Sequence, residues 1–383
     1  MSMLERKNKR PSYTDGEKQN ENNKVLKIEN FMNDKFLFTK IFDLDNPDDY
    51  VWKLGALGNL IKDNIKAAWR NNTVVALNNI LETTKYSDAN ILEMFSELYT
   101  SKKMKLPFGI NRISEVHREQ FESDVFNFTH ENSCHINMEY FVIPSSSNNM
   151  LNTWNDFTLE FFSKIGLNSD LMITASQNIA DHPSTDDYFF DRFITKFKYP
   201  FGLETIFTVS DRIDFYFENH DKSFLEDEID KLRVFDDLRN EKLLPHMISI
   251  NIDVDKLILA LIFNAYEEFE VRNSKMPSLN FAPQIAPVKC CVFPKSSVDR
   301  MVQMRSEKLH TDLNKEFKTL MDDKGTIEIR TYKFKEIGVP YFIIVDPELL
   351  EDNLYIIRDN VSGVESTLSK EDIIFYIKNK INE

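Results

Sequence analysis

Residues 199–220 read YPFGLETIFTVSDRIDFYFENH, and this stretch decides how the rest of the chain is interpreted. It opens with YPFG, which is typical of a turn, and the β-rich residues 205–209 predict a strand directly after it. Residues 211–214 (DRID) then set three charged side chains among large apolar neighbours. Because burial of an unpaired charge is costly, this pattern predicts either an internal ion pair or the wall of a ligand site.

The composition limits the class of protein. A length of 383 residues is enough for two domains with separate cores. The formal net charge of −15 argues against a surface that wraps nucleic acid as a whole, because phosphate binding needs clustered Lys and Arg. Three cysteines (Cys134, Cys290 and Cys291) have the spacing of neither a disulfide framework nor a metal knuckle, so we expect a reducing compartment and no metal site. No apolar run approaches the roughly 20 residues of a membrane span, so we expect no membrane contact.

The pattern along the chain predicts an α+β protein in four parts. Residues 1–34 are polar, which predicts a disordered tail, and their acidic residues make them a poor mitochondrial presequence. Residues 35–275 predict the first domain, and residues 276–287 predict a Pro-containing linker. Residues 288–383 alternate short apolar strands with helices, as in a sheet covered by helices.

The spacing of apolar residues predicts the individual elements. We expect helices over residues 60–69, 87–103, 150–167, 223–241, 298–321 and 369–381. We expect strands near residues 106–110, 136–144, 205–209, 288–293, 326–332, 341–345 and 354–358, and a strand that turns into a buried helix over residues 244–263.

The opening stretch resembles a segment of glycyl-tRNA synthetases that reads roughly FGW-x-E…ADRTDYDL-x-x-H. The residues in matching order are Glu204, Asp211, Arg212, Asp214 and His220. Residues 53–69 (KLGALGNLIKDNIKAAW) resemble the start of the same core, and residues 286–294 (APVKCCVFP) resemble the first strand of the anticodon-binding domain. The resemblance implies a class II aminoacyl-tRNA-synthetase-like domain, an antiparallel sheet with flanking helices, followed by an anticodon-binding-like α/β domain.

The same resemblance implies a pocket that has lost its chemistry. Its residues are Ile113, Glu115, Glu139, Glu204, Arg212, Asp214, Ser249, Asn251, Asp253 and Lys256. Ile113 stands where the family has an arginine that neutralises the α-phosphate of ATP. Ser249 replaces the glutamate that senses glycine, and Lys256 replaces a stacking arginine although it lacks the planar guanidinium. Neighbouring side chains of a strand point to opposite faces, so we expect Arg112 to point away from the pocket.

The altered signatures, such as residues 106–119 (LPFGINRISEVHRE), resemble those of the accessory subunits of mitochondrial DNA polymerase gamma. That resemblance implies a protein of the mitochondrial matrix without catalytic residues, enzymatic activity or cofactor. It would bind the polymerase catalytic subunit and hold primer-template DNA for longer, because two partners then share the grip. The candidate contacts to partner or DNA, each of which also suits an ordinary solvated charge, are Lys295, Arg300, Arg305, Lys308, Arg330 and Lys333.

Oligomeric state and two other functions follow from the same comparison. About thirty residues separate Val75 from Leu106, too few for the helical insertion through which vertebrate accessory subunits dimerise, so we expect a monomer. The alternatives are an active glycyl-tRNA synthetase-like ligase and a non-catalytic tRNA- or RNA-binding relative. Glycine-dependent exchange between ATP and pyrophosphate separates the ligase from the other two.

Overall fold

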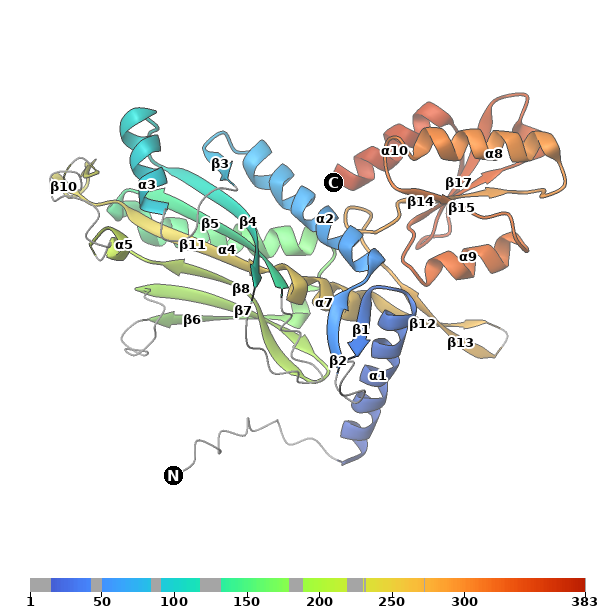
Figure 1. Cartoon of the computed structure of the whole chain (residues 1–383), viewed down its shortest axis with the longest axis horizontal. Coiled ribbons are helices and arrows are strands. Elements are labelled where there is room, and N and C mark those ends of the chain that lie inside the picture. The colour runs from blue at the N-terminus through green and yellow to red at the C-terminus, as the bar shows by residue number, and fades with distance from the viewer. Residues whose placement is uncertain are drawn as a thin grey trace.

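The structure is a computed structural model that describes residues 15–42, 50–83, 91–117, 132–178, 189–218, 230, 232–271 and 273–382. Its first domain is built on a seven-stranded sheet with the order β3-β4-β5-β11-β8-β7-β6 (Figure 1). The strands are β3 (Ile80–Thr83), β4 (Phe108–His117), β5 (Asn132–Val142), β6 (Met172–Asn178), β7 (Asp191–Tyr199), β8 (Gly202–Asp211) and β11 (His246–Asp253). All neighbouring pairs are antiparallel except β3 and β4, so the expected antiparallel sheet is confirmed.

Helices cover one face of this sheet. They are α2 (Ala56–Arg70), α4 (Ser147–Lys164) and α7 (Val254–Ala265), and their apolar sides form the largest core of the molecule. Because side chains alternate along a strand, Ile136 and Met138 of β5 enter this core, whereas Asn137 and Glu139 point to the other face of the sheet. That other face is called the open face below.

Part of the open face is covered by a second apolar cluster. It is formed by the short helices α3 (Ile91–Ser96) and α5 (Phe215–Glu218), with the π-helical turn η3 (Glu97–Ser101) continuing α3. The rings of Phe95 and Phe217 lie 5.2 Å apart, edge to face, above Phe141 of β5. This cluster closes one end of the open face and leaves the polar side chains of the neighbouring strands at the other end.

The N-terminal segment differs from the predicted disordered tail. Residues 15–34 form α1 (Asp15–Asp34), and a small antiparallel sheet of β1 (Phe38–Phe42) and β2 (Tyr50–Leu54) follows. Val25, Ile28 and Met32 of α1 are buried, at the three- and four-residue spacing of a helix face. The many polar residues between these positions concealed the spacing in the sequence. Residues 1–14 lie outside the described residues.

Two further predictions in the first domain are wrong. The part of the predicted helix over residues 223–241 that the structure describes contains β9 (Val234–Asp236), which pairs with β10 (Glu241–Leu243). The first residues of the predicted linker belong to the hairpin of β12 (Tyr266–Val271) and β13 (Ser274–Leu279). In both places, short strands held by pairing to a neighbour overrode the local pattern.

The C-terminal domain has a five-stranded mixed sheet with the order β15-β14-β16-β17-β18. Its strands are β14 (Cys290–Pro294), β15 (Thr319–Met321), β16 (Tyr341–Val345), β17 (Leu354–Asp359) and β18 (Glu365–Ser369). The helices α8 (Arg300–Leu313) and α10 (Lys370–Asn382) pack on one face, and α9 (Ile327–Lys335) packs on the other (Figure 1). The expected sheet covered by helices is confirmed.

The helix α9 replaces a predicted strand over residues 326–332. The Oγ1 atom of Thr326 accepts a hydrogen bond from the backbone N–H of Ile329 at 3.3 Å, which satisfies one of the free amides of the first turn. Phe334 and the half-buried Ile327 face the sheet. The β-branched residues Ile327, Ile329 and Thr331 favoured a strand locally, but the N-cap and the apolar face determine a helix.

The segment between the two domains is fixed rather than free. Nδ2 of Asn64 on α2 donates to the carbonyl oxygens of Ile285 and Ala286, at 3.2 and 2.9 Å. The buried ammonium of Lys289 donates to three carbonyls, those of Pro283, Gln284 and Ala286, each at 2.9 Å. Burial lowers the pKa of Lys289 to about 7. Among the described residues, no helix combines the length and apolarity needed to cross a bilayer.

Candidate functional site

The open face of the first domain gathers charged and polar side chains from four adjacent strands. Strand register places Arg112 of β4 opposite Asn137 of β5, and Glu139 of β5 opposite Ser249 of β11. Ser249 in turn pairs with Ser210 of β8. Because these positions alternate with the core residues, their side chains share the open face.

A hydroxyl group joins two charges at the centre of this face. The Oγ of Ser249 donates to the carboxylate of Glu139 and lies 3.4 Å from Nε of Arg212, which donates to it. Arg212 is buried, with 7% of its surface exposed, and Ser249 is 4% exposed. The buried guanidinium and hydroxyl and the half-buried carboxylate therefore form one hydrogen-bonded network.

A strained turn aims Arg212 at this network. Ile213 has φ +45°, a conformation that is costly for a β-branched residue. Its backbone N–H donates to Oδ1 of Asp211 at 2.8 Å, and Oδ2 of Asp211 accepts from the hydroxyl of Ser147 at 2.5 Å. The backbone N–H of Arg212 donates to the carbonyl of Met247 at 2.8 Å. Asp211 is therefore a structural residue that fixes the turn from the helix side of the sheet.

Two predicted pocket residues lie on the wrong face, and one residue that we had excluded lies on the right one. Ile113 pairs with Ile136 and packs against the core under the helices. Glu115 also points to that side, where it forms an ion pair with Lys62 of α2 at 3.2 Å. Arg112, by contrast, shares the open face with Glu139. Because neighbouring residues of a strand point to opposite faces, Ile113 and Glu115 cannot share the face that Arg112 occupies.

Three more of the predicted residues, Asp253, Lys256 and Glu204, make contacts with one another or with the backbone beside the open face. Oδ1 of Asp253 accepts from the backbone N–H of Lys256 at 3.0 Å and so caps α7. Nζ of Lys256 lies 3.5 Å from the carboxylate of Glu204 on β8. Burial raises the pKa of Tyr199, whose hydroxyl donates to the carbonyl of Lys256 at 2.9 Å. Asn251 follows Ser249 on the open face.

Two further residues of the resemblance, Asp214 and His220, remain to be located. The carbonyl of Asp214 accepts from the backbone N–H of Phe217 at 2.9 Å and so begins α5. His220 lies outside the described residues. Within the described ranges, no group of three or more His, Cys, Asp or Glu side chains has the arrangement of a metal site.

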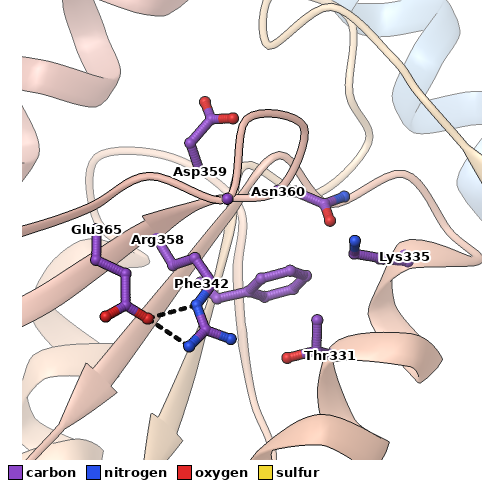
Figure 2. Close-up of a pocket in the computed structure, with 8 residues that line it drawn as sticks. Thr331, Lys335, Phe342, Arg358, Asp359, Asn360 and Glu365 are labelled. Carbon is purple, nitrogen blue, oxygen red and sulfur yellow. Dashed lines mark hydrogen bonds and ion pairs between the residues drawn. The ribbon is translucent and has the colours of Figure 1, made fainter.

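A second candidate site lies in the C-terminal domain, on the side of the sheet that carries α9 (Figure 2). It is a cavity of about 240 Å³ between α9, β16 and the ends of β17 and β18. The residues that line it are Thr331, Lys335, Phe342, Arg358, Asp359, Asn360, Gly363 and Glu365. They come from α9, from β16 and from the hairpin of β17 and β18, all within residues 331–365, and no motif in the sequence joined them as one site.

Two buried oxygen atoms of this cavity are available to accept hydrogen bonds from a ligand. Oδ1 of Asn360 and Oγ1 of Thr331 are buried and have no hydrogen-bond partner in the described part of the chain. Nδ2 of Asn360 is held by the carbonyl of Val339 at 2.9 Å, which fixes the direction of the amide. Burial and the nearby charge of Arg358 lower the pKa of Lys335. Nε of Arg358 donates to Glu365 at 2.6 Å, beside the ring of Phe342 in Figure 2.

Half of the contact residues that we predicted on this domain are bound within it. Arg330 is 3% exposed, and its Nη1 donates to the carbonyls of Pro294 and Asp322, at 3.0 and 2.8 Å. Lys295 forms an ion pair with Asp346 at 2.6 Å, and Lys333 forms one with Asp322. Arg300, Arg305 and Lys308 lie along α8. The prediction for Arg330 is wrong, because the guanidinium ties α9 to the sheet.

Comparisons with known proteins identify relatives with a named activity. A family model described as an anticodon binding domain matches residues 289–380. A glycine–tRNA ligase of Clostridium acetobutylicum is 28% identical over 290 residues, which are 75% of this chain and 60% of the relative. Glycine–tRNA ligases of Lachnoclostridium phytofermentans and Agathobacter rectalis are 27% and 26% identical, with the same shares of each chain. The chain thus spans about 60% of the length of the curated relatives it matches.

These relatives correct our functional expectation. The matched proteins are enzymes, which points to an enzyme rather than to an accessory subunit without activity. The comparisons support tRNA ligation and an anticodon-binding domain, and they lend no support to DNA replication, a mitochondrial role or polymerase processivity. The chain has a class II synthetase-like fold with a C-terminal anticodon-binding domain. The predicted monomeric state and matrix location stay predictions.

Proposed function

We propose that this chain is a glycyl-tRNA synthetase-like ligase, which activates glycine with ATP and transfers it to tRNA. The observation that carries the proposal is the extent of similarity to glycine–tRNA ligases. Their 290 aligned residues are far more than residues 289–380 contain, so the similarity also includes the domain with the open face. A chain that shared only its anticodon-binding domain with these ligases would align with them over about residues 289–380 alone.

The open face offers the charges that this reaction needs. In activation, a carboxylate oxygen of glycine attacks the α-phosphorus of ATP, the bond from that phosphorus to the bridging oxygen breaks, and pyrophosphate leaves to give glycyl-adenylate. Negative charge builds on the phosphate oxygens during this step. Guanidinium groups stabilise such charge because they present paired donors in a fixed plane, and Arg112, Arg192 and Arg212 lie on this face. The carboxylate of Glu139 suits the ammonium group of an amino acid.

The site also predicts slow chemistry. Ser249 is shorter than the glutamate that the family resemblance implies, and its hydroxyl is engaged by Glu139 and Arg212. Lys256 is paired with Glu204 and offers a point charge rather than a stacking plane. We therefore expect weak binding of ATP and turnover well below that of a typical ligase.

The C-terminal cavity supports a contact with RNA. A ring (Phe342) offers a stacking surface, and the unpartnered oxygens of Asn360 and Thr331 suit the edge of a base. Lys335 and Arg358 suit a phosphate or a base carbonyl. One unstacked base of a single-stranded loop fits a cavity of about 240 Å³.

Glycine-dependent exchange of radiolabelled pyrophosphate into ATP tests the proposal directly. We expect exchange by the full chain and a loss of about 100-fold in Arg112→Ala, the typical effect of removing one donor from a developing negative charge. Arg233→Ala, which removes an exposed arginine paired with Asp230, is the matched control and should change nothing. Absence of exchange from a folded chain that still binds tRNA would reject the ligase.

A further inference from the structure

The helix that forms one wall of the C-terminal cavity is held by the first domain. The ring of Tyr332 on α9 lies 5.6 Å from that of Phe269 on β12. Nζ of Lys335, one turn further along, lies 5.7 Å from the centroid of the same Phe269 ring. Glu336 forms an ion pair with Lys35, the residue after α1. Two residues of α9 and the residue that caps its C-terminus therefore contact the first domain.

The strand β12, which contacts α9, is in turn held by contacts with α1. Glu268 on β12 forms an ion pair with Lys27 of α1 at 3.2 Å, and the rings of Phe31 and Tyr266 meet edge to face at 5.4 Å. Beyond α9, Gly338 has φ +74°, and a Cβ atom there would lie 2.4 Å from the ring of Phe281. The end of α9 thus approaches the first domain as closely as a glycine allows. The β12–β13 hairpin contacts both α1 and α9, and it lies between these two helices in Figure 1.

Lys335 has two roles in this arrangement, since it lines the cavity and lies over Phe269. A lysine side chain has four flexible bonds, and fixing them on binding costs conformational entropy. An aromatic ring beneath the ammonium restrains it before the ligand arrives, and the ring quadrupole favours the charged form.

We propose that Phe269 is a positioning residue for RNA binding, and that the first domain completes the C-terminal cavity by holding Lys335 and α9 in place. This inference rests on the proposed function, because it takes the cavity to be an RNA site. It adds that the affinity of the C-terminal domain for RNA depends on the β12–β13 hairpin of the first domain.

The test uses the full chain and a transcript of glycine tRNA. Phe269→Leu keeps apolar volume but removes the ring, and we expect about three- to ten-fold weaker binding, the range of a cation–π contact with some added mobility. Phe269→Tyr keeps the ring and should bind within about two-fold of the parent. Phe375→Leu on α10, where the side chain is 68% exposed, is the matched control and should bind normally.

A spectroscopic signal separates positioning from general loosening. In the parent chain, the ring current of Phe269 should shift the Hε resonances of Lys335 upfield, and Phe269→Leu should abolish this shift while Phe269→Tyr retains it. Weaker binding by Phe269→Leu with an unchanged Lys335 resonance would overturn the inference. If Phe269→Leu does not fold, Phe269→Met takes its place, because it also keeps apolar volume and removes the ring, and the same loss of binding and of the upfield shift is expected.

The failure of the inference differs from the failure of the proposed function. Lys335→Gln removes the cavity charge itself and should weaken RNA binding about as much as Phe269→Leu does. Unchanged affinity in Lys335→Gln would show that the cavity is not the RNA site, and both proposals about it would fall. A loss in Lys335→Gln with none in Phe269→Leu would remove only the positioning role.

Discussion

Ser249 is the residue on which the hydrogen-bonded network of the open face depends, because its hydroxyl connects Arg212 with Glu139. We expect Ser249→Ala to destabilise the fold by about 1–3 kcal/mol, since the buried guanidinium of Arg212 and the half-buried carboxylate of Glu139 lose the hydroxyl that they share. Urea unfolding followed by circular dichroism measures this. Ser163→Ala on α4, where the exposed hydroxyl bonds a carbonyl of its own helix at 3.1 Å, is the control and should stay within about 0.5 kcal/mol.

Lys289 gives a prediction about pH at the same scale. Its pKa is lowered from the ordinary value to about 7 by burial, so between pH 7 and about 10 the unfolded chain binds a proton that the folded chain does not. The free energy of unfolding should therefore rise with pH in this range, by about 1.4 kcal/mol per pH unit relative to Lys289→Met. Parallel stability curves for the two proteins would contradict a lowered pKa.

Among the elements, α1 is a helix that the sequence analysis took for part of a disordered tail. It is tied to the hairpin beside the C-terminal domain, because its residue Lys27 forms an ion pair with Glu268 of β12. Phe31 on this helix is 6% exposed, and Phe31→Ala should destabilise the fold by about 3–5 kcal/mol. Leu26 on the same helix is 53% exposed, so Leu26→Ala should have an effect below about 1 kcal/mol. A disordered tail would give two neutral variants, and thermal unfolding distinguishes the cases.

The same elements show how far the sequence alone could lead. Five consecutive apolar residues predicted β16 with its observed bounds, because a fully buried strand has one simple signature. The sequence did not determine which side chains of β4 face the pocket. Arg112 and Ile113 are adjacent and point to opposite faces, so an error of one residue exchanges the two faces. The cavity near Phe342 and Asn360 was not predicted, because it forms only when α9 folds onto the sheet, and residues 326–332 of that helix were predicted as a strand.

For the whole molecule, the important feature is that the linker is bound from both sides. Asn64 of the first domain and Lys289 of the second donate to the same carbonyl, that of Ala286. A junction fixed in this way makes the two domains unfold together, because separating them leaves buried polar groups without partners. We expect a single calorimetric transition for the parent chain.

Asn64→Ala should divide that transition. The variant leaves the carbonyl of Ile285 without its side-chain donor, which costs about 1–3 kcal/mol at the junction and little inside either core. One domain should then melt earlier, and a protease should cut near residues 280–287 before either domain unfolds. Asn59→Ala on the same helix removes bonds only to the carbonyls of Leu54 and Gly55, so it should keep a single transition. Two transitions in the parent chain, or a single one in Asn64→Ala, would mean that these hydrogen bonds do not couple the two domains.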